Sequence, residues 1–178
     1  RRKPRFVHAD RCTCCDQCAQ ACVLRDQISD PFQMGLSRRS AIYRSFDEAL
    51  PATYTVDPDH CLLLTEGECA EGPPCALACP EDAVAFDQEP VEQTLQVGTI
   101  IVATGYDLYP IENMGEYGGG KIPDVVTSLQ FERMLSASGP TGGEVRRPSD
   151  GKVPKEVVFL TCCGSRDPES HLPYCSKI

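Results

Sequence analysis

The sequence has no apolar run approaching the roughly 20 residues of a membrane-spanning helix, so we expect no transmembrane segment. No apolar stretch follows the basic residues at its start, so we expect no secretory signal peptide. It does not begin with Met, and we expect it to be a piece of a longer protein. Basic residues are in deficit: 17 Lys and Arg against 26 Asp and Glu give a formal net charge of −9. Nucleic-acid binding needs a basic face, so this class of function is excluded.

The deficit of basic residues is concentrated in one part of the chain. Residues 45–120 hold 15 acidic residues and no basic residue. One explanation of this stretch is a solvated surface that keeps the protein soluble. The other is a docking face for a redox partner, because complementary charge speeds the encounter of two proteins.

Cysteine, in contrast, is abundant, with 12 residues. At this density a secreted disulfide scaffold competes with a metal site in a reducing compartment. The chain lacks a secretory signal and its cysteines occur in tight groups, so metal ligation is favoured. The groups are Cys12, Cys14, Cys15, Cys18 and Cys22; Cys61, Cys69, Cys75 and Cys79; and Cys162, Cys163 and Cys175.

The first group contains the spacing C-x2-C-x2-C-x3-C, formed by Cys12, Cys15, Cys18 and Cys22. Bacterial-type ferredoxins bind [4Fe–4S] clusters with this spacing, and the fourth cysteine ligates the other cluster of a pair. Zinc is the alternative metal, but it usually takes two C-x2-C pairs set far apart. Cys14 is an additional thiol to which the pattern assigns no role.

The second group repeats the first with longer loops. Its spacings are x7 and x5, but it ends in the regular Cys75-x3-Cys79-Pro80. A degenerate half that has lost its cluster is one interpretation, and the survival of four cysteines in order favours ligation. We expect two metal-binding sets: Cys12, Cys15 and Cys18 with Cys79, and Cys61, Cys69 and Cys75 with Cys22.

The sequence predicts short regular elements around these groups. Each cysteine loop should lead into a short helix, and two short strands should pair with each other near the second group. A stretch between the two groups should have little regular structure apart from one helical segment. The predicted helices are 18–23 and 75–79, the strands are 54–56 and 84–86, and the irregular stretch is 24–53 with its helical segment near 39–44.

The last third of the chain has a different character. Residues 95–103 and 157–160 are apolar, β-branched runs typical of strands buried on both faces of an α/β sheet. Residues 128–137 have the spacing of an amphipathic helix with Ser128 as its N-cap. Residues 149–152 should form a turn.

Several strings in the chain resemble the A subunit of heterodisulfide reductase and its relatives, which include a subunit of quinone-interacting oxidoreductase complexes. The strings are VGTIIVATGYD at 97–107, SASGPTGG at 136–143, PSDG at 148–151, CCGSRD at 162–167 and PYCS at 173–176. The resemblance implies a larger flavoprotein with a ferredoxin domain inserted into it. We therefore expect an α+β two-cluster ferredoxin-like domain at 1–92, followed at 93–178 by part of an α/β, thioredoxin-reductase-like flavoprotein domain that binds FAD.

The resemblance also implies two further sites. The backbone of Ala103, Thr104 and Gly105 would approach FAD, but the G-x-G-x-x-G fingerprint for its pyrophosphate is absent, so the FAD site is incomplete in this chain. Cys162 and Cys175 would face one another as ligands of a third [4Fe–4S] cluster, completed by cysteines beyond Ile178. Cys163 would not be a ligand and would turn into the packing of the sheet.

We expect a subunit of a cytoplasmic, soluble oxidoreductase complex that transfers electrons between FAD and [4Fe–4S] clusters. The resemblance implies other subunits of a heterodisulfide-reductase-like complex, a hydrogenase or formate dehydrogenase donor, a ferredoxin acceptor and, in some members, electron bifurcation. No residue is expected to perform acid–base catalysis. One alternative is a stand-alone ferredoxin carrier, which has no use for residues 93–178. The other is a zinc-stapled interaction module, which would be colourless.

Overall fold

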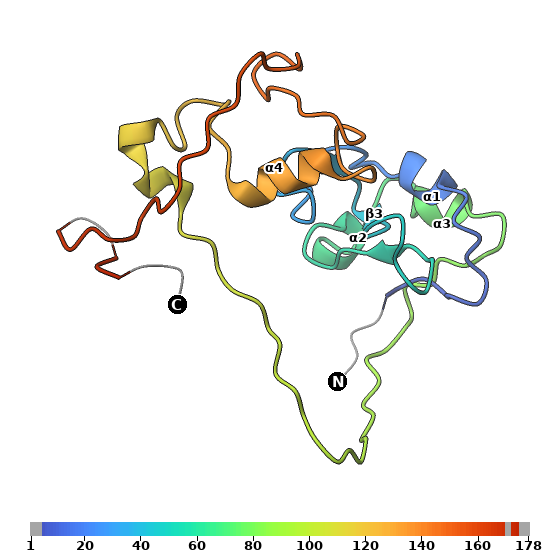
Figure 1. Ribbon diagram of the computed structural model, residues 1–178. Coiled ribbons are helices and arrows are strands. Elements are labelled where there is room, and N and C mark those ends of the chain that lie inside the picture. The colour runs from blue at the N-terminus through green and yellow to red at the C-terminus, as the bar shows by residue number, and fades with distance from the viewer. Residues whose placement is uncertain (1–4, 170–171, 175–178) are drawn as a thin grey trace. The chain divides into compact units, whose positions relative to one another are not determined.

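The computed structural model describes residues 5–169 and 172–174 (Figure 1). The chain divides into two compact units, Arg1–Gly98 and Thr99–Ile178, shortly after the boundary predicted at residue 92. None of the helices in the described ranges has the length and apolar character needed to cross a membrane.

Short helices and short antiparallel strand pairs form the described part of the first unit (Figure 1). The helices are α1 (Gln17–Gln20), α2 (Leu62–Thr65) and α3 (Pro74–Leu77), and the strands are β1 (Ile28–Ser29), β2 (Arg38–Arg39), β3 (Ile42–Tyr43) and β4 (Thr55–Val56). Strand β1 pairs with β2, with Ile28 opposite Arg39. Strand β3 pairs with β4, with Ile42 opposite Val56.

The two helices that follow the cysteine loops are present, as the sequence predicts, but each is a single turn. Helix α1 begins after Asp16, whose φ of 68° is left-handed and turns the chain sharply. Helix α3 has Pro74 in its first position, where the missing N–H is not needed for a helical hydrogen bond. Because both helices are so short, Cys22 and Cys79 lie just beyond their C-terminal ends.

The predicted pairing of strands 54–56 and 84–86 is wrong. Strand β4 pairs with β3, while Val84 forms an isolated antiparallel bridge with Val7. The N-terminal segment lies between the two predicted partners: the N–H of Val56 donates to the carbonyl of Arg5 at 2.9 Å, and the N–H of Ala85 donates to that of Phe6 at 2.9 Å. Successive residues of this segment therefore bond to opposite sides, which keeps the predicted partners apart.

The expectation of a helical segment near 39–44 is also wrong, because this part of the chain is extended. Residues 38–39 belong to β2 and residues 42–43 to β3. Ile42 is 1% exposed and faces the core from its strand pairing with Val56. The irregular stretch at 24–53 thus contains three short strands among its described residues.

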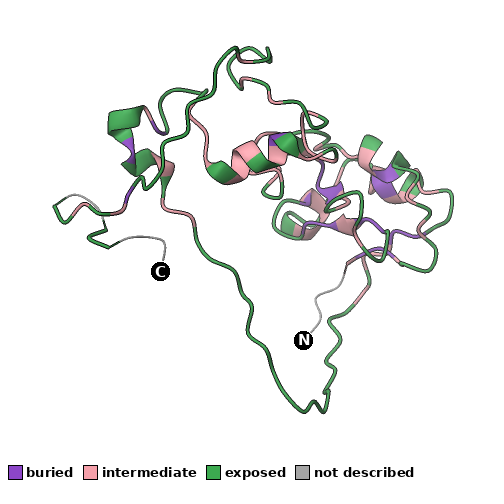
Figure 2. Cartoon of the chain, in the orientation of Figure 1, coloured by how far each residue is buried: buried purple, intermediate pink, exposed green. Residues whose placement is uncertain are grey.

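The first unit has a core assembled from segments far apart in the sequence, visible as the purple stretches in Figure 2. Its members are Phe6, Val7, Ile28, Ala41, Ile42, Tyr54, Val56, Ala83 and Val84, together with the thiols Cys18, Cys61 and Cys75. Phe86 stacks on Phe6 at the edge of this core, with ring centroids 6.1 Å apart. Cysteines are therefore part of the packed interior of this unit.

The second unit contains the predicted amphipathic helix as α4 (Ser128–Leu135), preceded by the 3-10 turns η1 (Ile111–Asn113) and η2 (Gly115–Tyr117). Its N-cap is Thr127 and not Ser128. The Thr127 hydroxyl accepts from the N–H of Gln130 at 3.2 Å, and the Gln130 side chain accepts from the N–H of Thr127 at 2.9 Å. This reciprocal capping box satisfies two N–H groups, which places Ser128 inside the helix. The turn predicted at 149–152 is confirmed by the bond from the N–H of Gly151 to the carbonyl of Arg147 at 2.8 Å.

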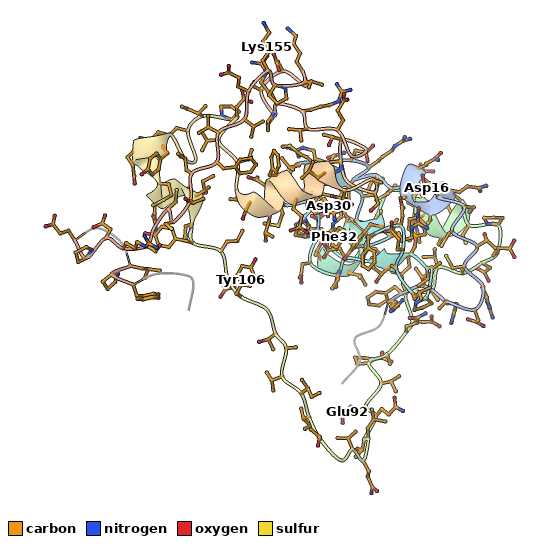
Figure 3. The ribbon with its side chains drawn as sticks, viewed as in Figure 1. Asp16, Asp30, Phe32, Glu92, Tyr106 and Lys155 are labelled. Carbon is orange, nitrogen blue, oxygen red and sulfur yellow. The ribbon has the colours of Figure 1, made fainter. Side chains whose placement is uncertain are left out.

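The two buried strands predicted at 95–103 and 157–160 are not formed. Both segments are irregular and exposed, with Ile101 87% and Val158 80% accessible. Tyr106, labelled in Figure 3, is 76% exposed just after the first of them. A parallel strand needs neighbours to take up its N–H and C=O groups, and no strand of the described chain lies beside either segment. The fold class of both units stays a prediction.

Candidate metal centres

Two small cavities lie within the first unit and are lined by cysteine thiols. The thiols around the first cavity belong to Cys12, Cys14, Cys15, Cys18 and Cys79. Those around the second belong to Cys22, Cys61, Cys69 and Cys75. The structure therefore brings together both of the four-cysteine sets that the spacing predicts, with Cys14 added to the first. Whether these sets ligate metal stays a prediction.

Each short helix and the residues just after it supply one thiol to each cavity. Cys18 in α1 lines the first cavity and Cys22, just beyond α1, lines the second; Cys75 in α3 lines the second and Cys79, just beyond α3, lines the first. Helices α1 and α3 pack against each other (Figure 1). The two cavities consequently adjoin.

The loop before α1 is shaped by residues with left-handed backbone conformations. Cys14 has a φ of 57° and Asp16 a φ of 68°. Asp16, labelled in Figure 3, accepts hydrogen bonds from the hydroxyl of Tyr54 and from the Gln20 side-chain amide, the latter at 3.2 Å. Tyr54 is 7% exposed, so the loop is anchored to the core of the unit.

The buried thiols differ in their electrostatic surroundings. Burial raises the pKa of Cys18 and of Cys75 to about 12 each, and neighbouring cysteines add to the effect. Burial also opposes ionisation of Cys12, but its pKa is lowered because hydrogen bonds from the backbones of Tyr54 and Cys14 and from the side chain of Thr53 outweigh that effect. Metal ligation requires thiolates, so binding at these sites would release protons.

Cys14, Thr53 and Tyr54 were not assigned to the site from the sequence. Burial, followed by the adjacent Cys12, raises the pKa of Cys14, while the guanidinium of Arg44 acts in the opposite direction. The position of Cys14 between two expected ligands was the available signal for its proximity. Thr53 and Tyr54 are far from Cys12 in sequence, and they reach it because β4 lies beside the N-terminal segment.

The arrangement of the thiols bears on which metal they suit. Among the described residues, no three or more His, Cys, Asp or Glu side chains are grouped so that they could hold one metal ion. A single zinc ion requires sulfurs about 2.3 Å from one point. A [4Fe–4S] cube instead takes thiolates spread around its corners. The preference for a cluster over a single zinc ion stays a prediction.

The third group of cysteines is only partly described. Cys162 is exposed with a left-handed φ of 60°. Cys163 is also exposed, and its thiol donates to the carbonyl of Leu160 at 3.4 Å, so its predicted burial in sheet packing is wrong. The predicted sheet is missing around it. Cys175 lies outside the described residues, and its expected approach to Cys162 stays a prediction.

The residues expected to approach FAD lie on the surface. Ala103, Thr104 and Gly105 are exposed and lie in irregular structure. A side chain added at Gly105 would meet no atom within 4 Å. Neither thiol-lined cavity includes any of the three. Their expected approach to FAD stays a prediction.

Comparisons with known proteins match the chain over essentially its whole length, although no family model matches it. It is 44% identical over 179 residues to the A subunit of a ferredoxin- and F(420)H(2)-dependent CoB-CoM heterodisulfide reductase of Methanosarcina acetivorans, covering 100% of this chain and 21% of the relative. It is 44% identical over 177 residues to the A subunit of an H(2):CoB-CoM heterodisulfide,ferredoxin reductase of Methanothermobacter thermautotrophicus, covering 99% and 25%. It is 47% identical over 182 residues to an iron-sulfur A subunit of the CoB-CoM heterodisulfide reductase of Methanopyrus kandleri, covering 99% and 26%. The chain thus spans about a fifth to a quarter of the length of these relatives.

Proposed function

This chain corresponds over essentially its whole length to a segment of the A subunit of heterodisulfide reductase, and on that premise we propose that it carries electrons within an oxidoreductase complex. The first unit would hold two [4Fe–4S] clusters, one in each thiol-lined cavity. The observation that supports this most strongly is the grouping of cysteines from two distant loops around each of two adjoining cavities, five around the first and four around the second.

A [4Fe–4S] cluster bound in either cavity would accept and release single electrons. Cys12, Cys15, Cys18 and Cys79 would hold the first, and Cys22, Cys61, Cys69 and Cys75 the second. The backbone of the unit supplies hydrogen bonds to these sulfurs, for example from the N–H of Ala83 to Cys79 at 3.3 Å. The core around Cys18, Cys61 and Cys75 excludes water from the inner side of both sites.

The two sites suit the passage of electrons because they share their supporting helices. Cys18 and Cys75 are both buried, and Cys75 at the second site is close enough to contribute to the raised pKa of Cys18 at the first. An electron at one site would therefore have only the packed contact of α1 and α3 to cross.

The partners of the chain are proposed from the names of its relatives. One relative is named for ferredoxin and F(420)H(2), one for H(2) and ferredoxin, and one for H(2) or formate. We place the chain in a complex with other subunits of that kind, with a hydrogenase or formate dehydrogenase as donor and ferredoxin as acceptor. Electron bifurcation belongs to this proposal, as does a cytoplasmic location, where clustered thiols stay reduced. Electron transfer between FAD and the clusters also belongs to this proposal, with residues 103–105 approaching an FAD whose site is incomplete in this chain.

The proposal is tested with the full 178-residue chain, purified and reconstituted with iron and sulfide without oxygen. Dithionite should bleach its visible absorbance after about two electrons per chain, one for each cluster. Mixing with an oxidised two-cluster ferredoxin should restore the absorbance as electrons leave. A Cys163→Ser variant, altered outside both cavities, should behave like the wild type. A colourless protein that retains zinc would contradict the proposal and favour the interaction module.

A further inference from the structure

The walls of the two cavities differ in part. Four polar or charged side chains, Thr13, Asp16, Tyr54 and Glu81, border the first cavity together with the apolar Val7, Ala83 and Val84. Apolar side chains border the second, namely Val23, Ala41, Ile42, Val56, Leu63 and Phe86. Since each cavity is also lined by one predicted four-cysteine set, the difference between the sites lies in the surroundings of the sulfurs.

Hydrogen-bond donors are concentrated at the first cavity. The sulfur of Cys12 receives hydrogen bonds from the backbones of Tyr54 and Cys14 and from the side chain of Thr53, and that of Cys79 receives one from the N–H of Ala83 at 3.3 Å. At the second cavity the backbone of Ala76 donates a hydrogen bond to the sulfur of Cys75. Hydrogen bonds to the sulfurs are among the factors that set cluster potential, and they favour the more negative, reduced state.

A nearby positive charge and contact with solvent also favour reduction at the first cavity. The cation of Arg44 is close enough to Cys14 and Tyr54 to interact with both. Cys15 at the first cavity is exposed, whereas all four thiols of the second are buried or half-buried. A positive charge and contact with water both stabilise the added negative charge of a reduced cluster, while an apolar wall disfavours it.

Two carboxylates oppose this trend. Asp16 and Glu81 border the first cavity, and negative charge disfavours reduction. Both residues are exposed, so water and salt screen them. The Asp16 carboxylate also accepts hydrogen bonds from the side chains of Tyr54 and Gln20. Arg44 is also paired with Asp47, which offsets part of the effect of its positive charge.

We propose that the two sites are not equivalent: the site of Cys12, Cys15, Cys18 and Cys79 takes up an electron at a higher potential than the site of Cys22, Cys61, Cys69 and Cys75. This inference rests on the proposed function, in which both sites hold a [4Fe–4S] cluster. Each site gains one electron on reduction, and no bond in the protein is made or broken. In a half-reduced chain the electron resides at the first site. The second site is then the one suited to exchange with a low-potential, one-electron partner.

The test is a redox titration of the reconstituted full chain with dithionite and mediators, followed by EPR. Two one-electron waves are expected. Thr53→Val removes a hydroxyl beside Cys12 and should lower the potential of the higher wave. Arg44→Gln, a second change on that side, should act in the same direction. Val56→Thr introduces a hydroxyl into the apolar wall and should raise the lower wave.

Val91→Thr, at a position 62% exposed and lining neither cavity, is the matched control and should shift neither wave. A single wave, equal shifts of both waves in each variant, or a shift of the lower wave by Thr53→Val would overturn the inference while leaving the proposed function intact. Absence of iron and visible absorbance in the wild type would instead contradict the proposed function.

Discussion

Cys79 lines the same cavity as Cys12, although 67 positions separate them in the sequence. Cys75, only four residues before Cys79, lines the other cavity. The grouping of thiols in space therefore differs from their grouping along the chain. This exchange makes each cavity dependent on both cysteine loops, because each loop supplies ligands to both.

Cys79→Ser should remove one cluster and leave the other. The iron content of the reconstituted chain should fall from about eight to about four atoms per chain, because a cube that loses one of its four thiolates is no longer held. Iron quantification after removal of loosely bound metal measures this. Cys163→Ser, which changes an exposed thiol outside both cavities, should leave the iron content unchanged.

Pairs of substitutions test whether each cluster is held by cysteines from both loops or by the cysteines of one loop alone. Combining Cys12→Ser with Cys79→Ser should cost no more iron than either change alone, since both residues line the first cavity. Combining Cys75→Ser with Cys79→Ser should remove nearly all iron, since these residues line different cavities. The reverse pattern would show that each loop holds its own cluster.

Asp57→Asn should destabilise the first unit by about 3 kcal/mol, because it leaves the cation of Arg39 buried without its partner. The Arg39 guanidinium donates to the Asp57 carboxylate at 2.6 Å, and the two side chains are 11% and 10% exposed. Urea unfolding of the full chain measures the change. Asp47→Asn, which disrupts the more exposed pair with Arg44, should change the free energy of unfolding by less than about 1 kcal/mol.

The stability difference between wild type and Asp57→Asn should also depend on pH. Burial opposes ionisation of Asp57, but hydrogen bonds from Arg39 and from the N–H of Asp59 lower its pKa below the ordinary value of 3.8. A carboxylate whose pKa is depressed by folding stabilises the protein fully above its unfolded value, and this stabilisation is lost as the pH falls through the folded value. The difference should be constant near neutral pH and shrink below 3.8. A difference that instead shrinks as the pH rises would contradict this account of the pair.

Thr127→Ala should weaken α4 by about 1 kcal/mol, because it removes the hydroxyl that caps the N–H of Gln130. Hydrogen exchange of the α4 amides should then quicken by about fivefold. Ser128→Ala is the matched control and should not quicken exchange, since alanine favours a helix interior. Faster exchange in the Ser128 variant alone would show that Ser128 is the N-cap, as predicted from the sequence.

The chain expressed alone should not bind FAD tightly. Residues 103–105 are exposed and line neither cavity, and the glycine-rich fingerprint for the pyrophosphate is absent from the sequence. Fluorescence titration of the chain with FAD should show no saturable binding at micromolar concentrations of protein. Recovery of one FAD per chain after purification would show that the flavin site lies elsewhere in these residues.

The sequence predicts local features of this protein better than long-range ones. The cysteine grouping could be predicted because a C-x3-C step spans one helical turn, whatever surrounds it. The pairing of β4 could not, because residues 5–7 separate its expected partner from it and carry no distinctive pattern. The apolar runs at 95–103 and 157–160 indicate a preference for burial, but a run does not specify which strands would cover it. The Thr127-x-x-Gln130 pattern was present in the sequence and would have identified the correct N-cap.

The most direct test of the two-cluster sites is a count of iron, acid-labile sulfide and zinc in the full chain purified without oxygen. Two [4Fe–4S] clusters require about eight iron atoms and about eight sulfide ions per chain, with zinc near zero. Such a result would match four thiols around each of two cavities. Stoichiometric zinc without sulfide would contradict it, because zinc bound by thiolates needs no inorganic sulfur.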